Sequence, residues 1–599
     1  MKQPYALTIA IALLAPVVLE AQYATNTLDM NDVEALFHVN GLIGLNTSTY
    51  GPGYFVPNPG SGSGPSPLFA GNLWIGGLDS SGTLHLAAER FEQEGRDFFP
   101  GPLGTNASIS GTTMLAYNQL WKVSRADVMR QVAYFNCLAD PNCNEQLEFP
   151  GYTVPSYFYN WPAHGDVSLG QAFNLADFYD YNQDGQYNPD EGDAPCVPGD
   201  QALFSIFNDN LENHGESGGQ RIGLEVHFTP FAYNSNNVAV DQTVFMRYRI
   251  INRGALTLHN TYIGLWNDFD IGGGNDDYVQ CDVGRSLFYG FNGDAVDQDT
   301  NGYPGYGANP PAFGEVILQG PHLDADGVDN TDVNSLPGYN GTGFNDGIAD
   351  NEHIGMSHFV YFNNVQGATG DPDIAQDYYN YLEGRWRDGT PFTYSGTGYS
   401  TDTSAVQTDF MFPGNSDPLG VGTGGTLMPA WNEVTEGNMP GDRRALASMG
   451  PFTFVPGQQE DIVVAYVFTR AMSGGAEPSA QALKLNTDSI RAFAHTIPGL
   501  LDGSGSACDQ LPTAIASHAA GYNALRLFPN PATDKMTVLL PSGHAKGTIT
   551  LFDAQGAAVL EQTVLGAHTT LDLARLAPGL YLARVQEGAR NYSRTFVKE

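Results

Sequence analysis

Alternation of apolar and polar residues is the dominant pattern along this chain, and it predicts β-strands over much of its length. Residues 462–468 are apolar at every position, which is typical of a strand at the centre of a sheet. Closely spaced antiparallel strands favour two sheets packed face to face. The predicted fold class is therefore mainly β, with a β-sandwich body. Its clearest strands are expected at residues 73–78, 84–88, 224–228, 243–253, 261–266, 287–291, 450–454 and 462–468.

A helical period is clear in the segment from Pro478 to His495, where proline occupies the first turn. Residues 117–128 fit a strand followed by a short helix. Long loops rich in Asp and Gly separate the predicted elements of the body. The apolar residues of the predicted helix recur at the spacing of one face: Leu483, Leu485, Ile490, Phe493 and Ala494.

The end of the chain, residues 525–599, shows the same alternation in six or seven short runs separated by glycines. This pattern predicts a small immunoglobulin-like sandwich, and no residue set in it suggests catalysis. A Gly/Ser-rich linker is expected at residues 499–524, which leaves residues 22–498 as the body. Two interpretations of the terminal domain remain open, an ordinary sandwich that stays with the protein and an export signal.

The terminal segment carries a motif of six residues, Pro529, Asn530, Pro531, Pro578, Gly579 and Tyr581. With this motif the segment resembles the type A C-terminal sorting domain of the type IX secretion system of Bacteroidota. The resemblance implies export through the type IX machinery to the outer cell surface or the medium. It also implies removal of the domain, and either release or attachment to surface lipopolysaccharide. In residues 73–77, 160–165, 180–193, 199–202 and 264–282 the body is similar to large secreted proteins of the same group, which supplies no activity.

The amino terminus has the features of a secretory signal peptide. Lys2 precedes an apolar run from Ala6 to Leu19, and Ala21 provides a small residue for cleavage. This run is shorter than the roughly 20 apolar residues that a transmembrane helix needs. We therefore expect residues 1–21 to be a signal peptide and the mature chain to have no transmembrane segment.

The formal net charge of −39 changes this picture in one respect. Such a charge repels nucleic acid and anionic membranes, so nucleic acid is not an expected partner. Acidic disorder is the alternative explanation of the charge, but the many aromatic residues can supply a packed core. The composition therefore predicts a folded, acidic β protein that needs counterions.

Residues 180–191 fit a calcium-binding loop at every required position. Carboxylate and amide oxygens at alternate positions, with a glycine at the sharp turn, suit a cation that takes six to eight oxygen ligands. A Gly-Asp-Ala-Pro segment follows, so we predict an isolated Ca²⁺ loop and not a helix pair. An Asp/Asn/Gly-rich turn without metal is the alternative. The predicted ligands are Asp180, Asn182, Asp184, Gln186, Asn188 and Glu191.

Three further acidic loops are weaker candidates for calcium. One surrounds Gly272–Gly274 and another repeats the first half of the calcium pattern but has Ala308 at its last position. The third, residues 324–352, resembles the aspartate-rich repeats of thrombospondin-type modules. The candidate ligands are Asp268, Asp270, Asp276 and Asp277 in the first loop, and Asp297, Asp299 and Asn301 in the second.

Five cysteines are compatible with disulfides in an oxidising compartment. Cys137 and Cys143 flank a turn-like spacer and are expected to pair. Cys196 with Cys281 is a second hypothesis, which leaves Cys508 unpaired.

Two classes of function remain. The first is a non-catalytic, calcium-stabilised protein that serves adhesion, glycan binding or an extracellular coat. It is favoured because the sequence contains neither a nucleophile motif nor a zinc motif. The alternative is a secreted polysaccharide hydrolase, which needs two acids across a sugar. An aromatic patch at residues 378–386 fits either sugar stacking or core packing. The sequence favours the non-catalytic class without deciding between the two.

Overall fold

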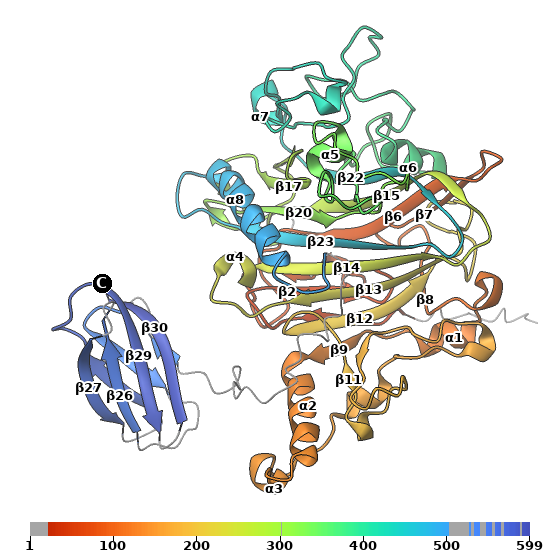
Figure 1. Cartoon of the computed structure of the whole chain (residues 1–599). Helices are drawn as coiled ribbons and strands as arrows, with labels where there is room; N and C mark the ends of the chain where they lie inside the picture. Colours follow the sequence, from red (N-terminus) through yellow and green to blue (C-terminus); the bar gives the residue numbers. More distant parts are fainter. Residues whose placement is uncertain are drawn as a thin grey trace, which may run out of the picture. The chain divides into compact units, whose positions relative to one another are not determined.

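The computed structural model describes residues 22–300 and 302–501, and most of the chain from Arg526 to Lys598. Within that last region residues 529–531, 540–546, 554–556, 565–567 and 588–589 are not described. The predicted signal peptide and residues 502–524 of the predicted linker lie outside the described residues. The chain divides after residue 511 into two compact units, the body and the C-terminal domain (Figure 1).

A nine-stranded antiparallel sheet forms the centre of the body. Its order is β16-β17-β20-β23-β14-β13-β12-β8, and β9 also pairs with β12. The apolar run at 462–468 lies in β23, between β20 and β14, which explains why both of its faces are apolar. The strands are β8 (Phe99–Pro100), β9 (Trp121–Ser124), β12 (Gln201–Asn208), β13 (Leu224–Ala232), β14 (Thr243–Asn252), β16 (Asp277–Asp282), β17 (Leu287–Asn292), β20 (Ala312–Gln319) and β23 (Gln459–Thr469).

A five-stranded antiparallel sheet of order β21-β22-β15-β6-β7 packs against the first sheet. The rings of Phe269 and Phe313 lie 6.1 Å apart between the two sheets. On the opposite face Trp74 contacts Tyr378 of α6 (Ala375–Leu382) at 4.8 Å. The mainly β sandwich predicted from the sequence is confirmed. The strands are β6 (Ala70–Leu78), β7 (Leu84–Ala88), β15 (Leu258–Phe269), β21 (His358–Asn363) and β22 (Arg443–Phe454).

Short strands complete the sandwich near the amino end of the body. A three-stranded sheet of order β1-β2-β5 leads toward β6 through the bridge between Ile43 and Gly71. Tyr54 packs its ring 5.2 Å from Phe313 and so joins this sheet to the core. The short strands at the amino end are β1 (Thr25–Leu28), β2 (Glu34–His38), β3 (Leu45–Asn46), β4 (Gly51–Pro52) and β5 (Tyr54–Phe55). Two separate pairs of short strands occur later in the chain: β10 (Phe178–Tyr179) with β11 (Ala194–Pro195), and β18 (Val296–Asp297) with β19 (Gly307–Ala308).

Helix α8 (Ala476–Ala494) lies across β20 and β23 on the outer face of the nine-stranded sheet (Figure 1). Leu483 and Ile490 are fully buried there, whereas Leu485 is 67% exposed. The helix predicted at Pro478–His495 is confirmed, but Leu485 does not belong to its buried face. The short helix α4 (Val238–Asp241) packs beside α8.

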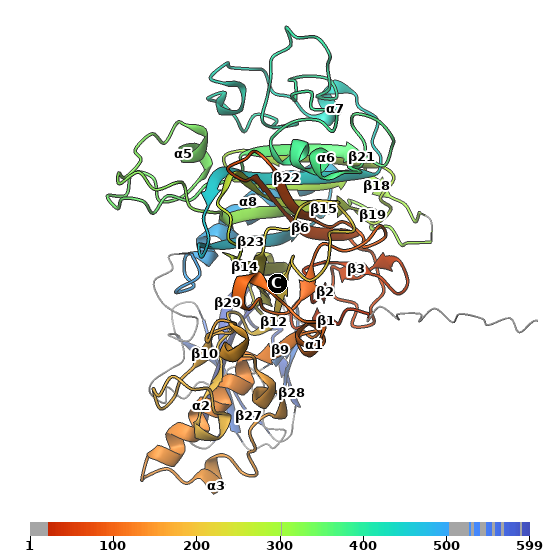
Figure 2. The ribbon, with the colours of Figure 1, turned by 90° about the vertical axis from the view of Figure 1, so that its right-hand side faces the viewer.

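An arm of residues 105–195 extends from the sandwich in both views (Figures 1 and 2). Its main element is α2 (Arg125–Ala139), which is longer than the short helix predicted after residue 117. Cys137 and Cys143 form a disulfide at the end of this helix. The other helices of the arm are α1 (Gly111–Ala116), α3 (Glu145–Glu148), η1 (Thr105–Ala107), η2 (Ser156–Asn160), η3 (Val167–Leu169) and η4 (Pro189–Glu191).

The second pairing hypothesis, Cys196 with Cys281, is wrong. Cys281 is a free thiol buried in the core, so it is not the partner of Cys196. Cys196 is itself disulfide-bonded. Cys508 lies outside the described residues.

A long insert, residues 364–442, separates β21 from β22 although these two strands pair directly. Figure 1 shows its loops beyond the five-stranded sheet, around α7. Besides α6, the insert contains η5 (Val421–Thr423) and α7 (Glu433–Glu436). Another loop region carries α5 (Leu336–Asn340).

The C-terminal domain has two antiparallel sheets, of order β24-β25-β28 and β27-β26-β29-β30. Its own core includes Leu527, Ile549, Val585 and Phe596. Tyr581 stacks on Phe596 at 5.6 Å, and Pro529, Asn530 and Pro531 lie outside the described residues. The strands are β24 (Arg526–Phe528), β25 (Lys535–Leu539), β26 (Gly547–Phe552), β27 (Ala558–Val564), β28 (His568–Asp572), β29 (Gly579–Glu587) and β30 (Arg590–Lys598).

Candidate metal sites

The predicted calcium loop, residues 180–191, lies between β10 and β11, which pair as a two-stranded ribbon. The Asp180 carboxylate accepts hydrogen bonds from the backbone N–H groups of Gln183 and Gly185, at 2.7 and 2.8 Å. Gly185 has a φ of 75°, a conformation that glycine adopts at little cost. The loop is thus already closed around its first predicted ligand.

Several predicted ligands of the loop also turn toward one another. The side-chain amide of Asn182 donates to Asp184 Oδ2 at 3.1 Å and to Glu191 Oε2 at 2.9 Å. Asn188 caps η4 by accepting from the backbone N–H of Asp190. Gln186 donates its backbone N–H to Asp184 Oδ1, at 2.8 Å. Among the described residues, three carboxylate oxygens lie within 4.8 Å of one another in a different acidic group, which is described below. The carboxylate oxygens of Asp180, Asp184 and Glu191 are farther apart than this.

Two residues that the sequence analysis missed hold the loop in place. Asp193 is buried and accepts from the backbone N–H groups of Tyr181 and Asn188, at 2.8 and 2.7 Å. Burial raises its pKa. Gln131 of α2 donates to the carbonyl oxygen of Pro189 at 2.7 Å. Asp193 follows the last ligand position and could have been suspected, whereas Gln131 lies too far away in sequence.

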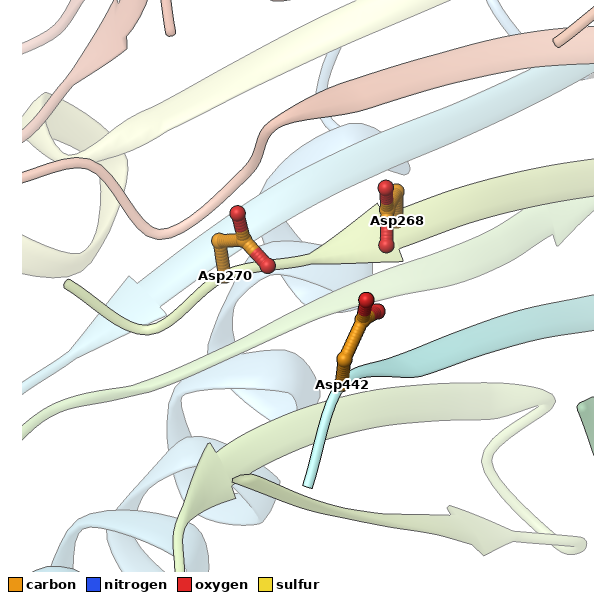
Figure 3. A group of neighbouring side chains, drawn as sticks. All are labelled: Asp268, Asp270 and Asp442. Carbon is orange, nitrogen blue, oxygen red and sulfur yellow. The ribbon is translucent and has the colours of Figure 1, made fainter. Parts of the chain in front are cut away.

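A compact acidic group, which we name the aspartate triad, consists of Asp268, Asp270 and Asp442. Each offers a carboxylate oxygen, and these three oxygens lie within 4.8 Å of one another. Figure 3 shows the three carboxylates pointing toward a common centre. Asp268 is at the end of β15 and Asp442 directly precedes β22, and these strands are antiparallel neighbours. The pairing of the strands therefore explains the proximity of residues far apart in sequence.

The environment of the triad is strongly acidic. Arg444 is the nearest cation, with Nη1 3.2 Å from Asp442 and Nε 3.7 Å from both Asp268 and Asp371. Burial raises the pKa of Asp268 well above its usual range although Arg444 opposes this shift. Burial raises the pKa of Asp270 to about 7, and the charge of Asp442 adds to the effect. The site thus favours either protons or a bound cation.

The other residues predicted in the acidic loops have different surroundings. Asp277 is buried and accepts from the backbone N–H of Ile271, and it is not a member of the triad. Asp276 lies outside the triad as well. Asp297 accepts from the backbone N–H groups of Gly273 and Tyr306. The exposed Asp299 accepts from Gly305, at 2.9 Å, and Asn301 lies outside the described residues.

The acidic region 324–352 forms interlocked exposed turns. Asp350 Oδ1 accepts from the backbone N–H groups of Asp326 and Gly327, both at 2.8 Å. Asp329 accepts in the same way from Asn345 and Gly347. Backbone donors therefore occupy several carboxylate oxygens of this third acidic loop.

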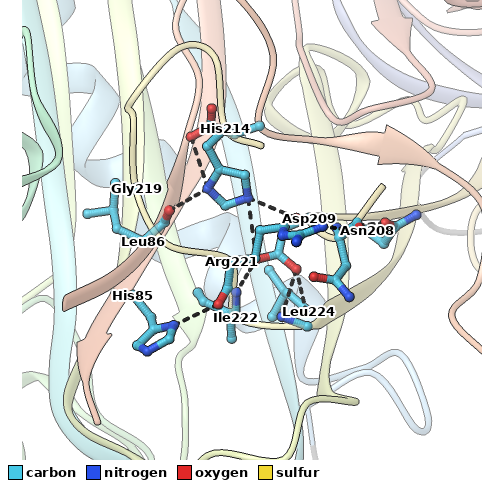
Figure 4. A network of polar contacts seen from close by, with 12 residues as sticks. His85, Leu86, Asn208, Asp209, His214, Gly219, Arg221, Ile222 and Leu224 are labelled. Carbon is cyan, nitrogen blue, oxygen red and sulfur yellow. Dashed lines mark hydrogen bonds and ion pairs between the residues drawn. The ribbon is translucent and has the colours of Figure 1, made fainter. Parts of the chain in front are cut away.

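A buried network of polar contacts surrounds His214 and Asp209 (Figure 4). The two ring nitrogens of His214 face the carbonyl oxygens of Leu86 and Asp209, at 2.7 and 2.8 Å. The Asp209 carboxylate accepts from three consecutive backbone N–H groups that begin at Ile222. Because these hydrogen bonds all join side chains to backbone groups, the network holds loops together.

The aromatic patch at residues 378–386 belongs to the core. Tyr378, Tyr381 and Trp386 are fully buried and Tyr379 is 3% exposed. Trp386 donates its ring N–H to the carbonyl oxygen of Gly398, at 2.8 Å. Of the two interpretations made from the sequence, core packing is therefore the one observed.

Comparison with known families concerns the C-terminal domain. Residues 526–599 match the secretion system C-terminal sorting domain. The chain carries a type IX sorting domain. This domain marks the protein for export, so it is secreted or displayed at the cell surface. Among the described helices, none has both the length and the hydropathy needed to cross a bilayer.

No curated protein is similar enough in sequence to count as a relative. A solved polysaccharide lyase is similar with 7% identity and a TM-score of 0.17, over 66% of this chain and 35% of that one. PorZ, a surface component of the type IX secretion system of Porphyromonas gingivalis, has 11% identity and a TM-score of 0.12, over 72% of this chain and 48% of PorZ. The chain thus spans less than half of either protein, and neither likeness supports a conclusion about activity.

Proposed function

We propose that this protein is a secreted or cell-surface, non-catalytic protein that Ca²⁺ stabilises and that serves adhesion, glycan binding or an extracellular coat. The observation that carries the proposal is the loop of residues 180–191, closed around Asp180 by backbone hydrogen bonds, on an exported chain. Calcium prefers carboxylate, amide and carbonyl oxygens in a flexible arrangement. The loop offers these groups and is anchored to α2 from outside.

The donor set of the loop fits calcium better than a transition metal. Its predicted ligands are all oxygen donors, and the loop contains no His or Cys. The amide of Asn182 now donates to two carboxylates, Asp184 and Glu191. Rotation of this side-chain amide by 180° would direct its oxygen toward the carboxylates of Asp184 and Glu191. A cation bound between these oxygens would then replace the two hydrogen bonds. The partners that we propose at the cell surface are lipopolysaccharide and other surface glycans.

Thermal unfolding of the mature protein tests the calcium part of the proposal. A ligand present at 100 times its Kd stabilises the native state by about 2.7 kcal/mol. We therefore expect chelation to lower the melting temperature by several degrees, and Asp184→Ala or Glu191→Ala to remove much of this difference. Asp190→Asn is the matched control, because Asp190 lies in the loop at a position that is not a predicted ligand. A melt that chelator leaves unchanged would contradict the proposal.

Binding and hydrolysis assays on the same polysaccharides test the non-catalytic part. We expect polysaccharide to be retained by the immobilised protein without release of reducing sugar. Catalysis would require two suitably separated acids. Sugar release that disappears when one acid pair is replaced, in a protein that remains folded, would favour the hydrolase instead.

A further inference from the structure

The aspartate triad lies where the long insert joins the five-stranded sheet. Asp442 is the last residue of the insert, and Arg443 begins β22. Asp371, near the start of the insert, lies 3.7 Å from the Nε of Arg444. Carboxylates from both ends of the insert therefore lie near Asp268, which is in β15, and Asp270, which directly follows that strand.

A buried oxygen without a hydrogen bond distinguishes this group from an ordinary acidic surface. Asp268 is 3% exposed, and its Oδ1 has no hydrogen-bond partner. Its contact with Arg444 Nε is 3.7 Å long, beyond hydrogen-bonding distance. Figure 3 shows that this carboxylate is aimed into the triad. A buried polar atom in this state costs free energy unless a ligand satisfies it.

The charges around the triad do not balance. Three carboxylates, those of Asp268, Asp371 and Asp442, pair with the guanidinium of Arg444, and Asp270 adds a fourth carboxylate beside them. The next cation, Arg90, lies 3.0 Å from Glu216 and 3.5 Å from Asp371. With all four carboxylates ionised, and with the pair of Arg90 and Glu216 counted as neutral, four negative charges face one positive charge. A divalent cation would reduce this excess from three charges to one.

The local backbone also makes room for the carboxylates. A Cβ atom placed on Gly274 would lie 2.0 Å from Asp270 Oδ1. Only a residue without a side chain therefore lets the loop approach Asp270 this closely. The three donors are all oxygens, which suit Ca²⁺ or Mg²⁺ better than zinc or copper.

We propose that Asp268, Asp270 and Asp442 bind one divalent cation, preferentially Ca²⁺, which fixes the base of the insert to the end of β15. The site is separate from the loop at residues 180–191 and does not depend on it. Because the insert leaves and re-enters the sheet beside this site, the cation stabilises both of its ends together. Calcium outside the cell thereby controls how rigidly residues 364–442 are held.

Hydrogen exchange of the mature protein, with calcium or with chelator, tests this proposal without any mutation. Bound calcium makes openings that release the ion less frequent. When calcium is at 100 times its Kd, hydrogen exchange through such openings is about 100-fold slower. We expect this slowing in peptides from residues 364–374 and 437–444, and no change in α8. Equal exchange with calcium and chelator would mean that protons neutralise the triad, and it would overturn the proposal.

Two variants assign the effect to this site. Asp442→Asn keeps the shape of a side chain that is partly exposed, so the fold is expected to survive. This variant should lose one bound calcium ion per chain in equilibrium dialysis and lose the calcium response at the base of the insert. Asp184→Asn is the matched control and should keep that response while losing the response of residues 180–191. An Asp442→Asn protein with undiminished calcium binding would overturn the proposal, whatever the state of the other loop.

Discussion

At the scale of single residues, one carboxyl group, that of Glu315, is buried between the two sheets of the body. Glu315 of β20 is 2% exposed and accepts a hydrogen bond from Asn267 of β15, at 2.8 Å. Tyr466 donates to the same Asn267, so this polar group joins the two sheets inside the core. Burial raises the pKa of Glu315 to about 8. Its carboxyl group is therefore protonated in the folded protein at neutral pH.

Glu315→Gln should change how stability depends on pH. The unfolded chain releases the Glu315 proton at a lower pH than the folded protein, so this residue destabilises the fold as pH rises from about 4.5 to about 8. The contribution is about 1.4 kcal/mol per pH unit in this window. Gln keeps the acceptor for Asn267 without titrating. Urea unfolding at pH 5.5 and pH 8 should therefore show a smaller loss of stability for the variant.

The surroundings of Glu315 allow this effect to be separated from other acids. Tyr54, Tyr248 and Tyr466 face it, and burial raises the pKa of each of them well above the window. Glu212→Gln, at an exposed position, is the control. If both variants keep the pH dependence of the parent protein, Glu315 is not the group responsible.

At the scale of elements, periodicity predicted the strands because their apolar residues face a core. The run at 462–468 became the centre of β23, and the helix predicted at 478–495 became α8. The sequence analysis predicted the arm poorly. Val128, Val132 and Cys137 are buried in α2, but over the whole helix the apolar residues are only weakly concentrated on one face. A short apolar stripe is too weak a signal to reveal a helix of this length.

The candidate metal sites show the same limit. The loop at 180–191 is local, and its spacing alone indicated the ligands. The triad needs Asp442, which lies more than 170 residues after Asp268 and meets it only because β15 pairs with β22. Only strand register, which a single sequence does not reveal, identifies such a partner.

The buried face of α8 gives a prediction about packing. Leu483→Ala removes a fully buried side chain against the nine-stranded sheet and should cost about 2–5 kcal/mol of unfolding free energy. Leu485→Ala, two residues later, removes a side chain that is 67% exposed and should change stability by less than about 0.5 kcal/mol. Chemical denaturation measures both. Equal losses would mean that α8 does not pack as described.

At the scale of the whole molecule, the body and the C-terminal domain each have a hydrophobic core of their own. Removal of residues 525–599 should therefore leave the melting temperature of the body within about a degree of the full-length value, because no buried side chain of either core described for the body is lost. The same deletion should stop export, which fractionation of the native host measures. A body that unfolds on this truncation would show that the two units depend on each other.

Processing gives a second prediction at this scale. If the sorting domain is removed after export, intact-mass measurement of protein from the native host should show an end near residue 520. Full-length protein that includes Glu599 would contradict processing while leaving export untouched.

The buried Cys281 has a consequence for the order of events during biogenesis. Its thiol donates to the carbonyl oxygen of Met411 at 3.3 Å, and burial raises its pKa well above the usual range. Thiol exchange proceeds through the exposed thiolate. Once β16 is in its sheet, an alkylating reagent should reach this sulfur only after denaturation, so any wrong cross-link involving Cys281 has to form before the chain folds. Burial of Cys281 in the folded core therefore protects this thiol from disulfide exchange in an oxidising compartment.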